Sequence, residues 1–227
     1  GIAGTVGFEV RCSFLDTPFA NRKINNPDSK GIAYLCVHGI KSASLAKADG
    51  FLAPLRRVRD QRNRAQVERL NEILFPLGID RIDFDLDVAP VSRSAEGGSI
   101  TERHILYACS EKLKQAHREK SDMVRFLKRG LSVDLTWKQE SLLLEKDNPH
   151  FMYDVLGILK SLFLPRFFIQ PSVDETPDVR ETVAFARSIG AIAAYAYLGD
   201  VGESVTGDKK AECFEDVFLD DLMHFLA

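Results

Sequence analysis

Two short apolar runs near the start of the chain set the strongest limit on its fold. Residues 5–10 and 32–38 each have the length of a β-strand and are rich in β-branched and aromatic side chains. Glu9 lies where the first run ends, and His38 lies where the second run ends. We therefore expect a carboxylate and an imidazole at the ends of two short buried strands.

Glu9 and His38 are candidate metal ligands. A metal-dependent hydrolase of the α/β type needs such groups on strand ends, because ligands there are held rigidly while the loops beyond stay open to substrate. The alternative is a structural role, with Glu9 as a salt-bridged edge residue and His38 as a hydrogen-bonded histidine. The spacing of the two residues leaves both readings open.

The composition is that of a globular protein. The chain has 227 residues, 45% hydrophobic and 28% charged, which suffices for one large domain or a domain with a sub-domain. Its 30 basic and 33 acidic residues give a net charge of −3, so there is no overall field for nucleic acid or an acidic membrane surface. No signal peptide is recognisable, and no apolar run reaches the roughly 18 residues that span a bilayer. We expect a cytoplasmic protein that binds neither nucleic acid nor membrane.

The cysteines are expected to be reduced thiols. They are widely spaced and form no C-x-x-C pair, which argues against a disulfide framework and a zinc ribbon. The four are Cys12, Cys36, Cys109 and Cys213.

The two ends of the sequence suggest a piece of a longer chain. It opens at Gly1 without a methionine and enters a strand-like segment almost at once. It stops at Ala227, within an apolar helical pattern.

A basic helix is expected over residues 47–77, ended by Pro76 and Gly78. An apolar stripe follows one side of it, and arginines fill much of the remainder: Arg56, Arg57, Arg59, Arg62, Arg64 and Arg69. These arginines form either a solvated face paired with nearby acids or a phosphate-binding surface. A nucleic-acid surface is disfavoured by the nearly neutral charge and the lack of interleaved aromatic residues.

An acidic stretch follows this helix. Asp80, Asp83, Asp85 and Asp87 are interleaved with apolar residues. Alternation with a period of two predicts a strand with one solvated face, in preference to an acidic metal cluster.

A capping-box pattern predicts the start of the next helix. Ser99 and Glu102 have the spacing at which each side chain bonds a free backbone N–H of the first turn. His104 then lies in the first or second turn, on the same side as Ile100 and Ala108, and should point inward.

Near the end of the chain, a helix opened by Thr176 and Pro177 is expected to stop at Gly190 and to be followed by an apolar strand over 191–198. This order is typical of an α/β unit whose strand is covered on both faces. Functional loops collect at the carboxyl ends of such strands, which here places one at 199–210.

In their order along the chain, these segments resemble the polymerase and histidinol phosphatase (PHP) family of metal-dependent phosphoesterases. Residues 7–10 resemble the family's strand that ends in a metal-bridging glutamate. Residues 37–40 resemble the following strand, whose histidine is another ligand. Residues 100–105 resemble a helix start at which a basic residue followed by a histidine, here Arg103 and His104, helps to hold the substrate phosphate.

The resemblance implies part of a distorted β/α barrel with an inserted helical sub-domain. Residues 1–45 and 171–227 would form the barrel portion, and 46–170 a helical insertion or cap. It also implies divalent metal ions (Zn, Mn or Fe) on Glu9 and His38, and hydrolysis of a small phosphate ester. The chemistry is consistent, because a helix amino terminus attracts an anion and a metal ion polarises a phosphoryl group.

The sequence also departs from the family pattern. The family's His-x-His and Asp-x-His motifs are absent, and Tyr197 stands where a third ligand histidine is expected. Tyrosine is a poor ligand for zinc or manganese at neutral pH, because its pKa is about 10 and the phenol stays protonated. This pattern predicts a reduced metal centre and exposed strand edges that a flanking segment or a second copy of the chain would cover. The alternative function is a non-catalytic binding or regulatory module on a degraded PHP-like fold.

Overall fold

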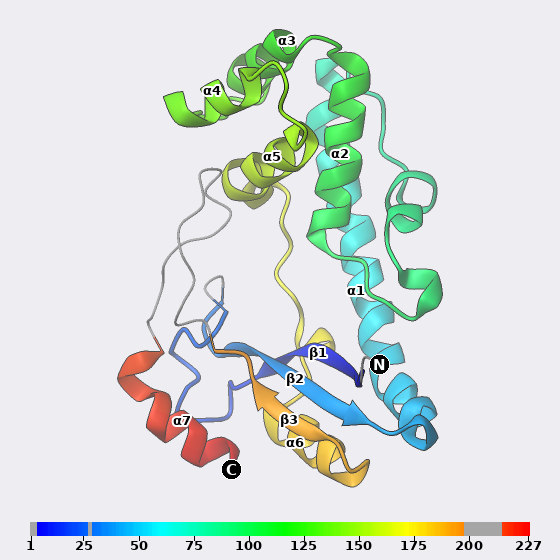
Figure 1. The fold of residues 1–227 in the computed structure, drawn as a ribbon, viewed down its shortest axis with the longest axis vertical. Helices are drawn as coiled ribbons and strands as arrows, with labels where there is room; N and C mark the ends of the chain where they lie inside the picture. Colours follow the sequence, from blue (N-terminus) through cyan, green and yellow to red (C-terminus); the bar gives the residue numbers. More distant parts are fainter. Residues whose placement is uncertain (1–3, 27–28, 198–214) are drawn as a thin grey trace. The chain divides into compact units, whose positions relative to one another are not determined.

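The computed structural model describes residues 4–26, 29–197 and 215–227. These residues fall into two compact units, each with its own core (Figure 1). One unit comprises the described residues of Gly1–Val58 together with those from Pro171 onward, and the other comprises Arg59–Gln170.

The first unit is built on a sheet of three antiparallel strands in the order β1-β2-β3 (Figure 1). The strands are β1 (Val6–Ser13), β2 (Ile32–Ile40) and β3 (Ile192–Tyr195). β1 and β2 contain the two apolar runs read from the sequence, so the presence of both strands is confirmed. The prediction that Glu9 lies at a strand end is wrong, because β1 continues to Ser13; His38 lies two residues before the end of β2.

A glycine closes the connection between β1 and β2. Gly31 has a φ of +65°, which L-residues rarely adopt, and a Cβ there would lie 2.6 Å from the carbonyl oxygen of Ala20. Only glycine fits this backbone turn, which delivers the chain into β2.

One face of the sheet carries the core of the first unit. Val10, Cys12 and Leu35 are buried against α6 (Val179–Ser188) and α7 (Leu219–Leu226). The first turns of α1 (Leu45–Leu74) pack there as well, where the rings of Phe51 and Phe185 stack with centroids 4.3 Å apart.

The segment from α6 to β3 follows the predicted order of helix, glycine and strand, with two differences in the strand. The Asp178 side chain caps α6 by accepting from the Arg180 N–H at 2.7 Å, and Gly190, with a φ of +69°, lies just beyond its end. β3 is shorter than predicted and pairs antiparallel with β2. Ile192 is 67% exposed, so the prediction of a strand covered on both faces is wrong. The predicted loop over 199–210 lies outside the described residues.

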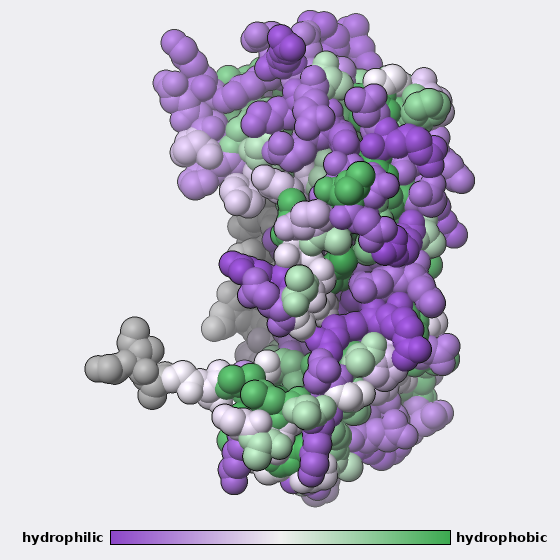
Figure 2. Space-filling model, turned by 90° about the vertical axis from the view of Figure 1, so that its right-hand side faces the viewer, coloured by the Kyte–Doolittle hydropathy of each residue, from purple (hydrophilic) through white to green (hydrophobic). Residues whose placement is uncertain are grey.

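The second unit is helical. It contains the part of α1 from Arg59 onward, with α2 (Glu102–Ala116), α3 (Lys120–Arg125), α4 (Trp137–Leu144) and α5 (Phe151–Ile158). Leu70, Leu106 and Phe163 are fully buried in its core. Hydrophilic residues predominate on the visible face of this unit, with apolar residues scattered among them (Figure 2).

The acidic stretch does not form the predicted strand. Phe84–Val88 is a π-helical turn, in which the Asp83 carboxylate accepts from the N–H groups of Asp85 and Leu86 at 2.8 and 2.9 Å. Phe84 and Val88 are buried in the helical core, while Leu86 is 77% exposed. The Asp83 cap and the burial of Phe84 and Val88, which are four residues apart, favour a helical turn over a strand. The alternating sequence permits both conformations, because it also places these two residues on one face of a helical turn.

The mixed α/β class is confirmed. A β/α barrel, however, is built on parallel strands, and the described strands are antiparallel. Cys12, Cys36 and Cys109 are free thiols, as predicted, and Cys213 lies outside the described residues. Within the described ranges, no helix has the length and apolar character needed to cross a membrane.

Candidate functional site

The pairing of β1 with β2 places Glu9 and His38 on the same face of the sheet. Glu9 is paired with Cys36, and Gly7 is paired with His38, one step of two residues away. Because side chains alternate between faces, all of these positions face away from the core of the first unit. We call the face that carries Glu9, Arg11, Tyr34, Cys36 and His38 the polar face.

The two predicted metal ligands are accessible. Glu9 and His38 are both exposed, whereas their neighbours Val10 and Val37 are buried on the opposite face. The ring of His38 lies beside Gly7, since a Cβ on that glycine would be 3.3 Å from Nδ1.

Cys36 lies between these two residues and was not recognised as a site residue from the sequence. Its Sγ–H donates to Glu9 Oε2 at 3.9 Å. Burial raises the pKa of the Cys36 thiol, and the negative charge of Glu9 raises it further. The spacing of Cys36 and His38, two residues apart in one strand, is the sequence signal that they share a face.

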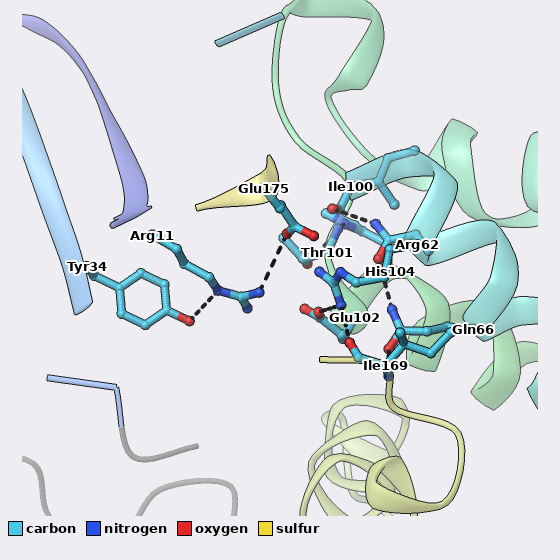
Figure 3. Close-up of polar contacts among 11 residues, drawn as sticks. Arg11, Tyr34, Arg62, Gln66, Ile100, Thr101, Glu102, His104, Ile169 and Glu175 are labelled. Carbon is cyan, nitrogen blue, oxygen red and sulfur yellow. Dashed lines mark hydrogen bonds and ion pairs between the residues drawn. The ribbon is translucent and has the colours of Figure 1, made fainter. Parts of the chain in front are cut away.

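Arg11 is a second residue of the polar face that the sequence reading missed. Its Nε donates to the Tyr34 hydroxyl at 3.0 Å, and its Nη1 lies 3.8 Å from Oε1 of the fully buried Glu175 (Figure 3). Tyr34 is held in turn by the buried Asn25, whose amide bonds both its N–H and its carbonyl oxygen, at 2.6 and 2.8 Å. A positive charge is thus fixed two residues along β1 from Glu9.

The predicted phosphate contacts lie at the start of α2, in the helical unit. The N-cap is Thr101 and the capping partner is His104, so the prediction of a box made by Ser99 and Glu102 is wrong. His104 Nδ1 accepts from the Thr101 N–H at 3.0 Å (Figure 3). Burial lowers the pKa of His104, and a neutral ring that accepts on Nδ1 carries its proton on Nε2. His104 can therefore donate one hydrogen bond to an anion, and Arg103 beside it is exposed.

Glu102 has a different partner from the one predicted. It accepts from Arg62 Nη1 at 2.8 Å, and that same nitrogen donates to the carbonyl oxygen of Ile169 at 3.1 Å (Figure 3). The Arg62 and Glu102 side chains are only 6% and 13% exposed. This ion pair anchors the start of α2 to α1 within the helical unit.

Tyr197, the counterpart of the family's third ligand histidine, makes an ordinary polar contact. Its hydroxyl donates to Asp216 Oδ1 at 2.7 Å, and the residue is 48% exposed. The contact leaves no reason to assign Tyr197 to a metal ion.

The donor types on the polar face suit a divalent cation, since a carboxylate, an imidazole and a thiol are the groups that bind zinc in proteins. In their present side-chain conformations, however, no three or more His, Cys, Asp and Glu residues within 4–26, 29–197 and 215–227 are arranged to hold a metal ion. The strand register brings the residues to one face but does not make their donor atoms converge.

Comparison with protein-family models, with curated proteins and with solved structures finds no match in any of the three. The resemblance to the PHP family therefore stays a prediction carried by short motifs, and the function has to be argued from the geometry.

Proposed function

We propose that this chain belongs to a metal-dependent phosphoesterase that hydrolyses a small phosphorylated substrate, with Glu9 and His38 as metal ligands. The observation that carries the proposal is the β1–β2 register, which brings a carboxylate and an imidazole from separate strands to one exposed face. A divalent zinc, manganese or iron ion, when bound there, would polarise a phosphoryl group and lower the pKa of a bound water.

Arg11 supports an anionic substrate at the same face. Its guanidinium is oriented by Tyr34, and its side chain retains 16% exposure. A guanidinium held in place by Tyr34 and Glu175 can attract a phosphate without first losing side-chain freedom. Arg11 would bind and orient the phosphoryl group beside Glu9.

Arg103 and His104 stay candidate phosphate contacts of the helical unit. α2 has 15 residues, so its amino terminus carries a full helix dipole, and the His104 Nε2–H adds a neutral donor. The PHP-like barrel also stays a prediction, and the antiparallel strands do not add support to it.

One observation favours the alternative of a non-catalytic binding module. Catalytic zinc sites use three protein ligands, and across the described segments no three ligating side chains converge in the present conformation. A module of this kind would bind phosphate through Arg11 without hydrolysing an ester.

The metal content of the purified chain, measured by elemental analysis, tests the first proposal. We expect near-stoichiometric divalent metal and hydrolysis of an aryl phosphate with added zinc or manganese. Glu9→Gln and His38→Ala should each weaken metal binding by at least about tenfold, because each removes a direct ligand.

Glu119→Gln and His150→Ala are matched controls, since both residues are exposed and lie in the helical unit. If Glu9→Gln and His38→Ala bind metal as tightly as the parent chain does, the ligand assignment is wrong. If the parent chain binds phosphate but no metal, the binding module is the better description.

A further inference from the structure

We propose that Tyr107, Glu111 and Tyr153 form a surface site for an arginine side chain of a protein partner. All three residues lie in the helical unit, whereas the proposed metal ligands lie in the first unit. The inference is therefore independent of the proposed function.

Two tyrosine rings meet where α2 packs against α5 (Figure 1). The ring centroids of Tyr107, on α2, and Tyr153, on α5, are 6.5 Å apart, and the ring planes are tilted by 38°. Tyr107 packs on the core of the helical unit, whereas Tyr153 is 66% exposed. Cation–π attraction reaches about 6 Å from a ring centroid, so one cation can lie within range of both rings at this separation.

Glu111 places a carboxylate beside these rings. It lies four residues after Tyr107, on the same face of α2. Its negative charge is the main cause that raises the pKa of the Tyr107 phenol, which indicates that the two groups are close. No lysine or arginine in the described ranges forms an ion pair with Glu111, although Lys114 lies three residues further along the helix.

The same unit already holds a cation on such a combination of ring and carboxylate. The Cζ of Arg64 lies 4.2 Å from the centroid of the Phe84 ring, while its guanidinium donates to both carboxylate oxygens of Asp85. Lys120 likewise places its Nζ 4.9 Å from the centroid of the Phe151 ring. The two tyrosines and Glu111 offer the same groups, but no cation of the described residues occupies them.

This combination of groups favours arginine over lysine. A planar guanidinium can stack on an aromatic ring and at the same time donate two parallel hydrogen bonds to a carboxylate. The lysine ammonium is a compact and strongly hydrated charge that cannot do both. An exposed ion pair alone contributes little free energy, so the rings are needed to hold the arginine beside Glu111.

The fluorescence anisotropy of a fluorescein-labelled Gly-Arg-Gly-Arg-Gly peptide, titrated with the full chain at low ionic strength, tests this site. We expect saturable binding. A matching peptide with citrulline in place of arginine should bind at least about tenfold more weakly, because citrulline keeps the planar shape but lacks the positive charge.

Tyr153→Ala and Glu111→Gln should each weaken binding of the arginine peptide by about fivefold, since each removes one of the two attractions. Neither side chain belongs to the buried core, and circular dichroism establishes that both variants are folded. Trp137→Ala and Glu119→Gln are the matched controls. They remove an exposed aromatic ring and an exposed carboxylate elsewhere in the same unit, and they should leave binding unchanged.

Three results would each overturn the site. One is the absence of peptide binding, and another is equal binding of the arginine and citrulline peptides. The third is a loss of affinity in the control variants as large as that in Tyr153→Ala and Glu111→Gln, which would show that the peptide follows the overall charge and apolar surface of the chain.

Discussion

Gly7 occupies a position at which an added side chain meets backbone. It lies beside the register shift between Val6 and Gly7, and a Cβ there would be 2.4 Å from the carbonyl oxygen of Val37. Atoms in a packed protein do not come so close, so β1 would have to move away from β2. The glycine therefore sets the spacing of the strands that carry Glu9 and His38.

Gly7→Ala should lower the free energy of unfolding by about 1–3 kcal/mol, as measured by urea denaturation, because the clash is with backbone. Gly50→Ala is the contrasting variant. Nothing lies within 4 Å of a Cβ at Gly50, and the residue is inside α1, so alanine should stabilise by about 0.5–1 kcal/mol. Equal stability of Gly7→Ala and the parent chain would show that the two strands are not held this closely.

At the scale of the element, the start of α2 depends on a histidine in a role usually filled by glutamate or glutamine. His104 Nδ1 accepts from the Thr101 N–H, which is possible only for a ring without a proton on that nitrogen. Burial lowers the pKa of His104 from 6.5, and the nearby Glu102 opposes this in part. Protonation and capping therefore exclude each other.

This coupling predicts a pH dependence of stability. As the pH falls below about 6.5, the unfolded chain takes up a proton on residue 104 before the folded chain does. The stability that the neutral cap provides is thus complete above that pH and is lost as the pH falls through the folded pKa. His104→Gln should keep the cap, because glutamine suits this position, and should flatten the change in unfolding free energy between about pH 7 and 5.

His104→Ala is the matched loss-of-cap variant and should cost about 1 kcal/mol at pH 7.5. Thermal unfolding across this pH range measures both effects. A His104→Gln profile that runs parallel to that of the parent chain would exclude the coupling.

At the scale of the whole molecule, ion pairs engage three of the arginines of α1. Arg56 pairs with Asp49, Arg62 pairs with Glu102, and Arg64 donates two bonds to Asp85 at 2.6 and 2.7 Å. The Arg64 guanidinium lowers the pKa of the Asp85 carboxyl. The sequence left two roles open for these arginines: a solvated face paired with nearby acids, or a phosphate-binding surface. The contacts agree with the paired face.

A chain with a net charge of −3 and paired arginines should bind nucleic acid weakly at most. We expect no change in the fluorescence anisotropy of labelled single- or double-stranded DNA or RNA at low ionic strength. A Lys/Arg-rich peptide of equal concentration serves as the positive control. Binding that weakens steeply with added salt would restore the nucleic-acid reading.

The sequence determined the elements whose signals are local. β1 and β2 follow from short runs of strand-forming residues, and α6 follows from an apolar period that ends before Gly190. These patterns need only neighbouring residues to act, because alternation, capping and glycine conformation operate over a few positions. Glu9 and His38 could likewise be picked out by residue type.

The tertiary structure decided which residues share a face and which of two local signals prevails. Register between β1 and β2 is set by pairing across a long connection, and it alone brings Cys36 opposite Glu9 and Tyr34 opposite Arg11. Packing in the helical unit makes 84–88 a helical turn and not a strand. It also places the N-cap of α2 at Thr101, because Glu102 forms an ion pair with Arg62 and not a capping bond. Such outcomes depend on partners distant in the sequence, whose contacts outweigh the small free-energy differences between local alternatives.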